Sequence, residues 1–328
     1  MTSPLPVIQK VVPDRAPIGP ESLVLVRFGE RCNMACPMCS NTGAPELATF
    51  PTAELLRRVD RVAGLGFRRA VFTGGEPTIH PGFFELARRV QGHGIRWDLN
   101  THGATFARRD LAERARELGL TRAIVSLHSH DPATSARITA APARMHAKTV
   151  TGIEHLLDAG VSVMTNVVLT TLNLHELEPY LAFCAARFGR RASVKISFPS
   201  IEVPRADWEP IGLRYDDVRA VLRAVPRWAE AHGIESCFQS VPSCVHGDAT
   251  ARDVGRSGWG ETHYLDDRTG TEVHSMAFIE AALSVHAPAC RSCPALEQCP
   301  GVGRRYAERF GVGELTPFPP TGGTPWWV

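Results

Sequence analysis

Residues 23–39 read Leu-Val-Leu-Val-Arg-Phe-Gly-Glu-Arg-Cys-Asn-Met-Ala-Cys-Pro-Met-Cys, an apolar run that leads directly into three cysteines. The run Leu23–Phe28 has the length and the β-branched content of a buried strand. Cys32, Cys36 and Cys39 follow it with the spacing Cys-x3-Cys-x2-Cys. With nine cysteines in 328 residues, such a three-cysteine spacing would arise by chance about 0.007 times per chain. The spacing therefore indicates a chemical role for these three thiols.

The same unit, an apolar run followed by an amphipathic stretch, repeats as far as about Ser197. The runs that we predict as strands are Leu23–Phe28, Arg69–Thr73, Arg96–Asn100, Arg122–His128, Val161–Leu169 and Val194–Phe198. The stretches that we predict as helices are Ala53–Leu65, Pro81–His93, Phe106–Leu118, Met145–Ala159, Leu174–Phe188 and Asp216–His232. Alternating strands and helices predict parallel strands joined by right-handed crossovers. Six such units predict an α/β fold, a partial (β/α)6 TIM-like barrel, with its chemistry at the carboxyl ends of the strands.

The composition divides the chain into three predicted parts. Residues 1–20 form an N-terminal arm without the apolar core of a signal peptide, residues 21–233 form the barrel, and residues 234–328 form a small cysteine-rich extension with a helix near Met276–Val285. The net charge of +2 gives no reason to expect nucleic-acid or membrane binding. We expect a cytoplasmic protein, in which the cysteines do not form disulfides and their spacing indicates their role.

Three cysteines on one loop suit an iron–sulfur cluster better than zinc. Structural zinc takes four ligands in a closed tetrahedron, whereas three thiolates can hold three irons of a [4Fe–4S] cubane and leave the fourth iron open. A small chelating molecule, such as S-adenosylmethionine (SAM) with its amino and carboxylate groups, can fill the open position. The sequence therefore predicts an open cluster at Cys32, Cys36 and Cys39.

The Cys-x3-Cys-x2-Cys loop after the first strand resembles the signature of the radical SAM superfamily. The resemblance implies that an electron from the cluster cleaves SAM to methionine and a 5′-deoxyadenosyl radical, which then abstracts a hydrogen atom from a substrate. It also implies the partial barrel fold and an external reductant of the flavodoxin or ferredoxin type. The chain would then be an enzyme that acts on a peptide or a small molecule.

Further motifs after the strands resemble SAM-binding positions of this superfamily. Gly74-Gly75-Glu76-Pro77 follows the second strand, at the place where relatives bind the methionine amino group. Asn100, Ser126 and Asn166 stand at the ends of the third, fourth and fifth strands, and Arg137 is a candidate partner of the methionine carboxylate. Asn166 is also compatible with a capped strand end, and Arg137 with a surface salt bridge.

Two residues are candidates for chemistry on the substrate. His128, like His102 and His130, lies near the predicted mouth of the barrel and is a candidate proton donor or acceptor; the alternative is a local hydrogen-bonding role. Cys237 is a candidate hydrogen-atom donor if it binds no metal.

A second cluster, Cys290-x2-Cys293-x5-Cys299, lies in the extension. It resembles part of the SPASM or Twitch domains, which hold auxiliary [4Fe–4S] clusters in many radical SAM enzymes. This resemblance implies one auxiliary cluster, with Cys244 as the fourth ligand and Cys237 as the rival. A structural zinc site is the alternative. Cys184 lies in an apolar helical stretch and is predicted to be a core residue.

The resemblance leads to one preferred function and two alternatives. We expect a radical SAM oxidoreductase or maturase that acts in peptide (RiPP) or natural-product maturation. A dehydrogenase or epimerase of a small aminocyclitol or sugar alcohol is the first alternative, which the lack of a leader-binding domain before residue 21 favours. A non-catalytic iron–sulfur electron-transfer protein is the second.

Overall fold

The computed structural model describes residues 7–14, 17–41, 43–200, 211–249 and 261–319. Its centre is a sheet in the order β7-β6-β5-β4-β3-β2-β1-β8-β9. Strands β1 to β8 run parallel to their neighbours, and β9 is antiparallel to β8. The strands are β1 (Leu23–Arg27), β2 (Arg69–Thr73), β3 (Arg96–Thr101), β4 (Leu120–Ser126), β5 (Ser162–Val168), β6 (Ala192–Ser197), β7 (Glu235–Gln239), β8 (Thr262–Leu265) and β9 (Val273–Ser275). The predicted α/β fold with a partial barrel is confirmed.

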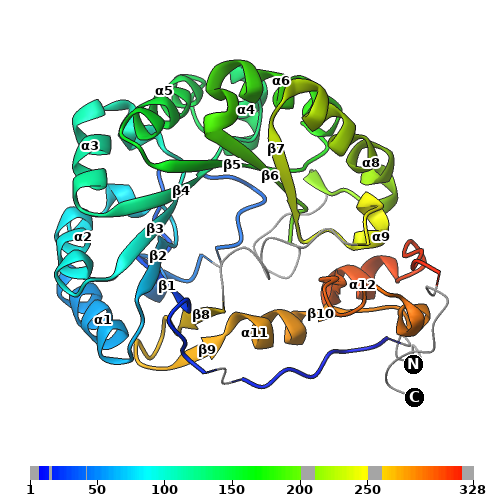
Figure 1. Ribbon diagram of the computed structural model, residues 1–328, viewed down its shortest axis with the longest axis horizontal. Coiled ribbons are helices and arrows are strands. Elements are labelled where there is room, and N and C mark those ends of the chain that lie inside the picture. The colour runs from blue at the N-terminus through cyan, green and yellow to red at the C-terminus, as the bar shows by residue number, and fades with distance from the viewer. Residues whose placement is uncertain (1–6, 15–16, 42, 201–210, 250–260, 320–328) are drawn as a thin grey trace.

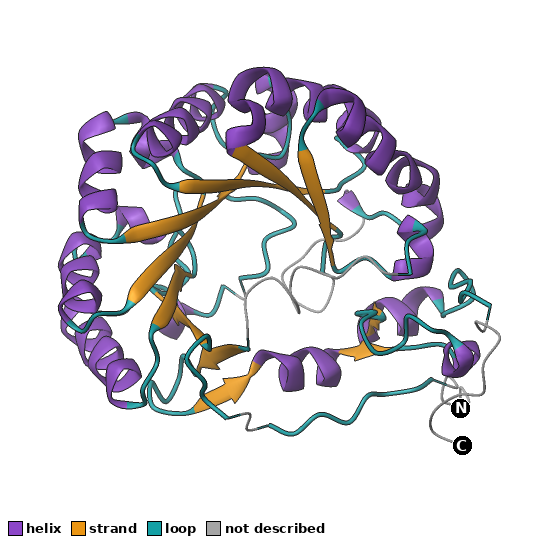
Figure 2. Cartoon of the chain, viewed as in Figure 1, coloured by secondary structure: helices purple, strands orange, loops and turns teal. Residues whose placement is uncertain are grey.

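Helices cover the outer face of the curved sheet, as Figures 1 and 2 show. They are α1 (Thr52–Gly64), α2 (Phe83–Gly92), α3 (Arg109–Glu117), α4 (Pro132–Thr139), α5 (Arg144–Asp158), α6 (Leu177–Phe188) and α8 (Tyr215–His232). Each long helix turns an apolar stripe to the sheet, as Leu55, Val59 and Val62 do in α1. Cys184 of α6 is fully buried in this layer, as predicted.

The predicted elements differ from the observed ones mainly at their ends. The predicted helix Phe106–Leu118 is divided into a 3-10 turn, Ala104–Ala107, and α3, because Arg108 has extended backbone angles. Helix α4 and strand β7 were not predicted. Strand β7 is short, and its sequence Glu-Ser-Cys-Phe-Gln lacks the apolar run of the other strands. It extends the sheet beyond β6, and Cys237 pairs with Lys195 there.

The interior of the barrel is arranged in layers along the strands. Side chains of every second residue point inward, so the ends of β2, β3 and β4 present Thr73, Asn100 and Ser126 to one mouth. Below them, Leu23 and Val71 form a small apolar cluster with Leu25 and Ile124 packed against it. This apolar layer separates the mouth at the carboxyl ends from the opposite end of the barrel.

The C-terminal region lies across the open side of the barrel (Figure 1). Its elements are α9 (Ser243–His246), α11 (Met276–Leu283), β10 (Ser284–Val285), β11 (Val302–Gly303) and α12 (Arg304–Phe310), together with β8 and β9. The predicted helix Met276–Val285 therefore ends at Leu283, and the next two residues pair with β11. Because β7 to β9 continue the barrel sheet, the predicted boundary at residues 233 and 234 stays a prediction.

Two buried carboxylates attach the C-terminal region to the barrel. Asp267 forms an ion pair with Arg27 of β1 at 3.1 Å, and Arg58 of α1 lies 3.8 Å from its carboxylate. Glu314 forms an ion pair with Arg214, just before α8. The arm from residue 7 also lies along this region, where Ile8 forms a bridge with His286. Within the described residues, no helix is long and apolar enough to cross a membrane.

Candidate functional site

A cavity of about 360 Å³ opens at the carboxyl ends of the strands. Its lining includes the three cysteines, the Gly-Gly-Glu loop and the ends of β2 to β7: Cys32, Cys36, Cys39, Thr73, Gly74, Gly75, Glu76, Asn100, His102, Ser126, His128, Asn166, Ser197 and Gln239. Parallel strands place their carboxyl ends on one side of the sheet, which explains why residues far apart in the sequence meet there. The cavity thus gathers most of the predicted cofactor-binding residues.

The three cysteines of the first loop are free thiols that interact with one another. Burial, together with the neighbouring Cys39 and Cys32, raises the pKa of Cys36 to about 12. Burial also raises the pKa of Cys32. A buried group of thiols so close together resists deprotonation unless a positive centre binds the thiolates. These residues therefore fit a metal cluster that supplies such charge.

The donor set of this loop fits a cubane better than a single metal ion. Within the described chain, no three His, Cys, Asp or Glu side chains lie close enough together to hold one metal ion. A cubane binds each thiolate to a different iron, so its ligands are spread more widely than those of a zinc ion. Glu76 and His102, which also line the cavity, have their polar atoms engaged as described below. Three thiols without a competing fourth donor on the loop match a cluster with one open iron.

The two glycines after β2 are required by close contact with the cysteine loop. A Cβ atom on Gly75 would lie 2.0 Å from the carbonyl oxygen of Arg31, and one on Gly74 would lie 2.3 Å from that of Gly29. Gly74 also has a φ of 123°, which side chains rarely adopt. The Gly75 amide donates to Gly29 O at 2.7 Å. The glycines therefore join two loops of the protein, and they do so at the wall of the cavity.

Glu76 is a buried acceptor that organises the neighbouring turn. Its side chain is almost fully buried and accepts hydrogen bonds from the Thr78 amide, the Thr101 hydroxyl at 2.7 Å and the His102 amide at 2.7 Å. A carboxylate with several donors can remain charged inside a protein. Glu76 thus fixes the end of β3 relative to the loop after β2, while Pro77 begins a 3-10 turn, Pro77–Ile79, beside it.

The remaining predicted SAM-binding residues differ in position. Asn100 donates to Thr73 at 3.3 Å, while its buried Oδ1 has no hydrogen-bond partner. This oxygen, at the cavity wall, fits a ligand that carries an N–H or O–H group. Asn166 accepts from Ser197 at 2.7 Å, and Ser126 lines the cavity. Arg137 is exposed on α4 and is not among the lining residues, so the fold does not bring it to the others.

The histidines around the mouth are held by local contacts. Burial lowers the pKa of His128 to about 4, and its Nδ1 accepts the Val168 amide, so the ring is neutral near pH 7. His102 donates to Asn33. His130 lies 3.9 Å from Glu176 and does not line the cavity. The proposed catalytic role of His128 stays a prediction.

Some residues of the cavity were not found from the sequence. Asn33, Ser197 and Gln239 were overlooked, although Ser197 and Gln239 line the cavity and Lys195 donates to Gln239 at 2.7 Å. Gln239 ends β7, which was itself not predicted. The alternation of inward residues along β6 would have indicated Ser197 had the strand register been known.

A second, much smaller cavity of about 20 Å³ is lined by four cysteines, Cys244, Cys290, Cys293 and Cys299. They come from α9 and from the turns that follow β10. Each is buried and forms no disulfide bond. Cys237 is not part of this lining and lies in β7, where its Sγ is 3.7 Å from Val194 O. Of the two rivals for the fourth position, Cys244 is the one placed beside the other three.

The four thiols influence one another electrostatically. Burial, together with the nearby Cys299, Cys244 and Cys293, raises the pKa of Cys290 to about 11. Burial likewise raises the pKa of Cys244, while the guanidinium of Arg219 lowers it. As in the first loop, deprotonated thiols here would need bound positive charge. Since no three His, Cys, Asp or Glu side chains of the described residues lie close enough together to hold one metal ion, the set fits a cluster better than a structural zinc ion, and the zinc alternative stays a prediction.

Comparisons with known proteins agree with the fold and the first loop. Residues 26–184 match the family model of the radical SAM superfamily. The chain is 29% identical over 188 residues to a probable GTP 3′,8-cyclase of Pyrococcus horikoshii, which covers 57% of this chain and 58% of that protein. It is 27% identical over 155 residues to an AdoMet-dependent heme synthase of Nitratidesulfovibrio vulgaris, covering 47% of this chain and 42% of that one. The chain thus spans 58% of the first relative's length and 42% of the second's.

Solved structures share the fold at low sequence identity. The structure of anSMEcpe with bound AdoMet superimposes with a TM-score of 0.54 at 16% identity and covers 68% of this chain and 62% of that one. The structure of Streptococcus suis SuiB bound to its precursor peptide SuiA gives a TM-score of 0.54 at 14% identity, with 67% and 49% covered. These likenesses concern the fold.

Proposed function

We propose that this protein is a radical SAM enzyme, which binds a [4Fe–4S] cluster through Cys32, Cys36 and Cys39 and cleaves SAM reductively at its open iron. The observation that carries the proposal is the shared cavity: three free thiols of one loop line it together with the strand-end groups Asn100 and Asn166. A site built for structural zinc would instead complete four ligands and exclude a co-substrate.

The residues of the chain bind and orient the co-substrate in this proposal. The unpartnered Oδ1 of Asn100 accepts a hydrogen bond from an N–H or O–H group of SAM. The glycines after β2 have no side chains, so the backbone of the cavity wall can approach the co-substrate closely. Glu76 acts indirectly, since its carboxylate is already occupied by protein donors. The apolar cluster of Val71 and Ile124 lies deeper in the barrel and limits access of water from that side.

When bound, the reduced cluster supplies one electron to the sulfonium of SAM, which yields methionine and a 5′-deoxyadenosyl radical that abstracts a substrate hydrogen atom. An external reductant of the flavodoxin or ferredoxin type would supply the electron. The described cysteines form no disulfide bonds, which suits a reducing compartment such as the cytoplasm.

We also propose that the four C-terminal cysteines bind one auxiliary [4Fe–4S] cluster. Cys244, Cys290, Cys293 and Cys299 line one cavity and are buried, as the ligands of a closed cluster would be. A SPASM- or Twitch-like extension of residues 234–328 is the corresponding domain proposal. Iron and acid-labile sulfide analysis tests it: a zinc content of one per chain without the second cluster would show that the site is structural zinc.

For the substrate, we propose a peptide or natural product undergoing maturation. A further cavity of about 170 Å³ adjoins the cavity at the strand ends and shares Phe198, Gln239 and Ser240 with it. Space that continues from the cluster loop toward Tyr306 favours a substrate longer than a single sugar ring. An aminocyclitol or sugar alcohol remains the alternative substrate. An assay that measures the consumption of peptides and of sugar alcohols distinguishes the two substrate classes.

Formation of 5′-deoxyadenosine tests the proposed reaction. Protein loaded with iron and sulfide under anaerobic conditions is reduced with dithionite and incubated with SAM, and the nucleoside is measured by liquid chromatography. We expect formation by the parent protein and its loss in Cys36→Ala. A matched control is Cys184→Ala, a buried cysteine that lines neither cavity. Full cluster loading without any 5′-deoxyadenosine would instead support the electron-transfer alternative.

A further inference from the structure

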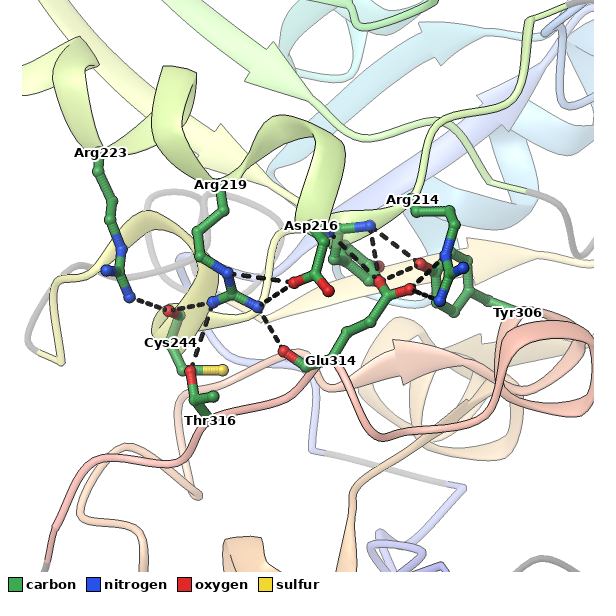
Figure 3. A network of polar contacts seen from close by, with 9 residues as sticks. Arg214, Asp216, Arg219, Arg223, Cys244, Tyr306, Glu314 and Thr316 are labelled. Carbon is green, nitrogen blue, oxygen red and sulfur yellow. Dashed lines mark hydrogen bonds and ion pairs between the residues drawn. The ribbon is translucent and has the colours of Figure 1, made fainter.

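One guanidinium group, that of Arg219 in α8, joins three segments of the chain (Figure 3). It donates to the Cys244 carbonyl at 3.1 Å, to the Glu314 carbonyl, and to the Thr316 hydroxyl at 3.4 Å. Asp216, three residues earlier in the same helix, accepts from it at 2.8 Å and holds its orientation. Helix α8 is thereby connected both to α9 and to the C-terminal segment.

Both segments that Arg219 holds belong to the wall of the cysteine-lined cavity. Cys244 is one of its four thiols, and Leu315 and Pro317, on either side of Thr316, cover it. Arg223, one turn further along α8, donates to the same Cys244 carbonyl at 3.1 Å. Cys244 lies on the four-residue helix α9, which has little stability of its own. Its position therefore depends on these outside contacts.

A second set of contacts supports the C-terminal segment from the other side. The Glu314 carboxylate accepts from the Tyr306 hydroxyl at 2.7 Å and the Tyr215 amide at 3.0 Å, and it pairs with Arg214. The carboxylate thereby accepts hydrogen bonds from backbone amides at the beginning of α8, where the helix itself offers no acceptors. The backbone of residues 314–316 is thus fixed to α8 at two points, by its carboxylate and through Arg219.

We propose that Arg219, assisted by Arg223, is the positioning residue of the auxiliary cluster: it holds Cys244 in place as the fourth ligand and keeps the 314–317 segment closed over the site. The inference rests on the proposed auxiliary cluster. A guanidinium suits the role because its planar group holds five N–H donors in fixed directions and can donate to several acceptors at once. A lysine ammonium has three donors on a flexible chain and matches such a set of acceptors less well. Outer partners of this kind orient metal ligands and hold them.

An ordinary surface ion pair with Asp216 is the simpler interpretation of Arg219. The burial argues against it, since the Arg219 side chain is 19% exposed and the Asp216 side chain 58%. Two carbonyls and a hydroxyl of other segments accept from Arg219, and an exposed pair does not need them. Arg223, although exposed, donates to the same Cys244 carbonyl as Arg219.

The test measures how firmly the auxiliary cluster is held. In the reduced, fully loaded protein, SAM perturbs the electron paramagnetic resonance of the cluster that it binds, and the signal insensitive to SAM reports the auxiliary cluster. We follow both signals during incubation with an iron chelator. Arg219→Gln is expected to lose the SAM-insensitive signal roughly 10-fold faster than the parent protein, with the SAM-sensitive signal decaying at the parent rate.

Three further variants complete the experiment. Arg219→Lys is expected to restore part of the protection, and Arg223→Gln, which alters an exposed side chain and leaves the fold intact, to weaken it to a smaller degree. Arg227→Gln, an exposed arginine one turn beyond Arg223, is the matched control and is expected to behave like the parent. Equal decay in the parent protein, Arg219→Gln and Arg223→Gln would overturn the inference.

The outcomes also separate this inference from the proposed function. A parent protein with iron for one cluster and no SAM-insensitive signal would refute the auxiliary cluster, and the role of Arg219 with it, while formation of 5′-deoxyadenosine would still support the radical SAM reaction. Two clusters in the parent with unchanged decay in the arginine variants would refute the positioning role alone.

Discussion

The Nε2–H of His102 donates a hydrogen bond of 2.7 Å to the side-chain oxygen of Asn33. The proton must be on Nε2, because Nδ1 accepts the Ala104 amide at 3.1 Å. His102 follows β3, and Asn33 lies directly after Cys32. The turn after the third strand is thus tied to the loop that carries the cysteines, and Glu76 holds the His102 amide from the other side.

Loss of this hydrogen bond should loosen the cysteine loop. We expect His102→Ala to lower the rate of 5′-deoxyadenosine formation roughly 10-fold, as the loss of outer partners does at other metal sites. His102→Gln should recover part of the rate because its amide can still donate to Asn33. His232→Ala, an exposed histidine at the end of α8, serves as the control. Equal rates in all variants would show that the contact has no part in the site.

Gly75→Ala should disrupt the contact between the two loops. The new methyl group would meet the Arg31 carbonyl, which is backbone and cannot rotate away. We expect a loss of about 3 kcal/mol in the free energy of unfolding, together with poor cluster loading. Gly64→Ala, in α1 with open space around it, should be neutral or slightly stabilising. Urea unfolding followed by circular dichroism measures both, and equal midpoints would contradict the proposed clash.

His128 should make the fold sensitive to acid. Burial lowers its pKa from 6.5 to about 4, so the unfolded chain binds a proton near pH 6.5 and the folded chain does so only near pH 4. The contribution of this histidine to stability is therefore complete above pH 6.5 and is lost as the pH falls from about 6.5 to about 4. In His128→Asn, whose amide oxygen can accept the Val168 amide in place of Nδ1, the decline should be shallower.

Urea unfolding at a series of pH values checks this slope, with His232→Asn as an exposed control. Identical pH profiles for the parent protein and His128→Asn would contradict it. The same variant also tests the candidate catalytic role: full formation of 5′-deoxyadenosine with loss of substrate conversion would support a proton-transfer role for His128.

Glu314→Gln should weaken the attachment of the C-terminal segment to the barrel. The amide nitrogen of glutamine cannot accept from the Tyr306 hydroxyl and the Tyr215 amide as the second carboxylate oxygen does. We expect a loss of about 2 kcal/mol in the free energy of unfolding, typical of unsatisfied buried donors. Glu308→Gln, which is exposed on α12, should change stability little. Hydrogen exchange in residues 311–319 should rise in the first variant and not in the second.

Much of the fold could be predicted because buried parallel strands have a strong local pattern. β2 was predicted with its observed bounds, Arg69–Thr73, and the other barrel strands within about two residues. β7 was missed because Glu235 and Ser236 interrupt its apolar character. Its place at the edge of the sheet, paired with β6, comes from tertiary packing that no short window of sequence contains.

The likeness of residues 26–184 to the radical SAM family model could be predicted from the spacing of Cys32, Cys36 and Cys39 and from the Gly-Gly-Glu-Pro turn, because residues on one loop stay close together in space. That Cys244 lies beside Cys290 could not be predicted from their spacing, since more than forty residues separate them. Only folding brings α9 beside the other three C-terminal cysteines. Nor could the sequence show that Arg219 bridges Cys244 and Glu314, because long-range hydrogen bonds depend on how whole elements pack. Local chemistry was determined by the order of residues, and the joining of distant segments was decided by the tertiary structure.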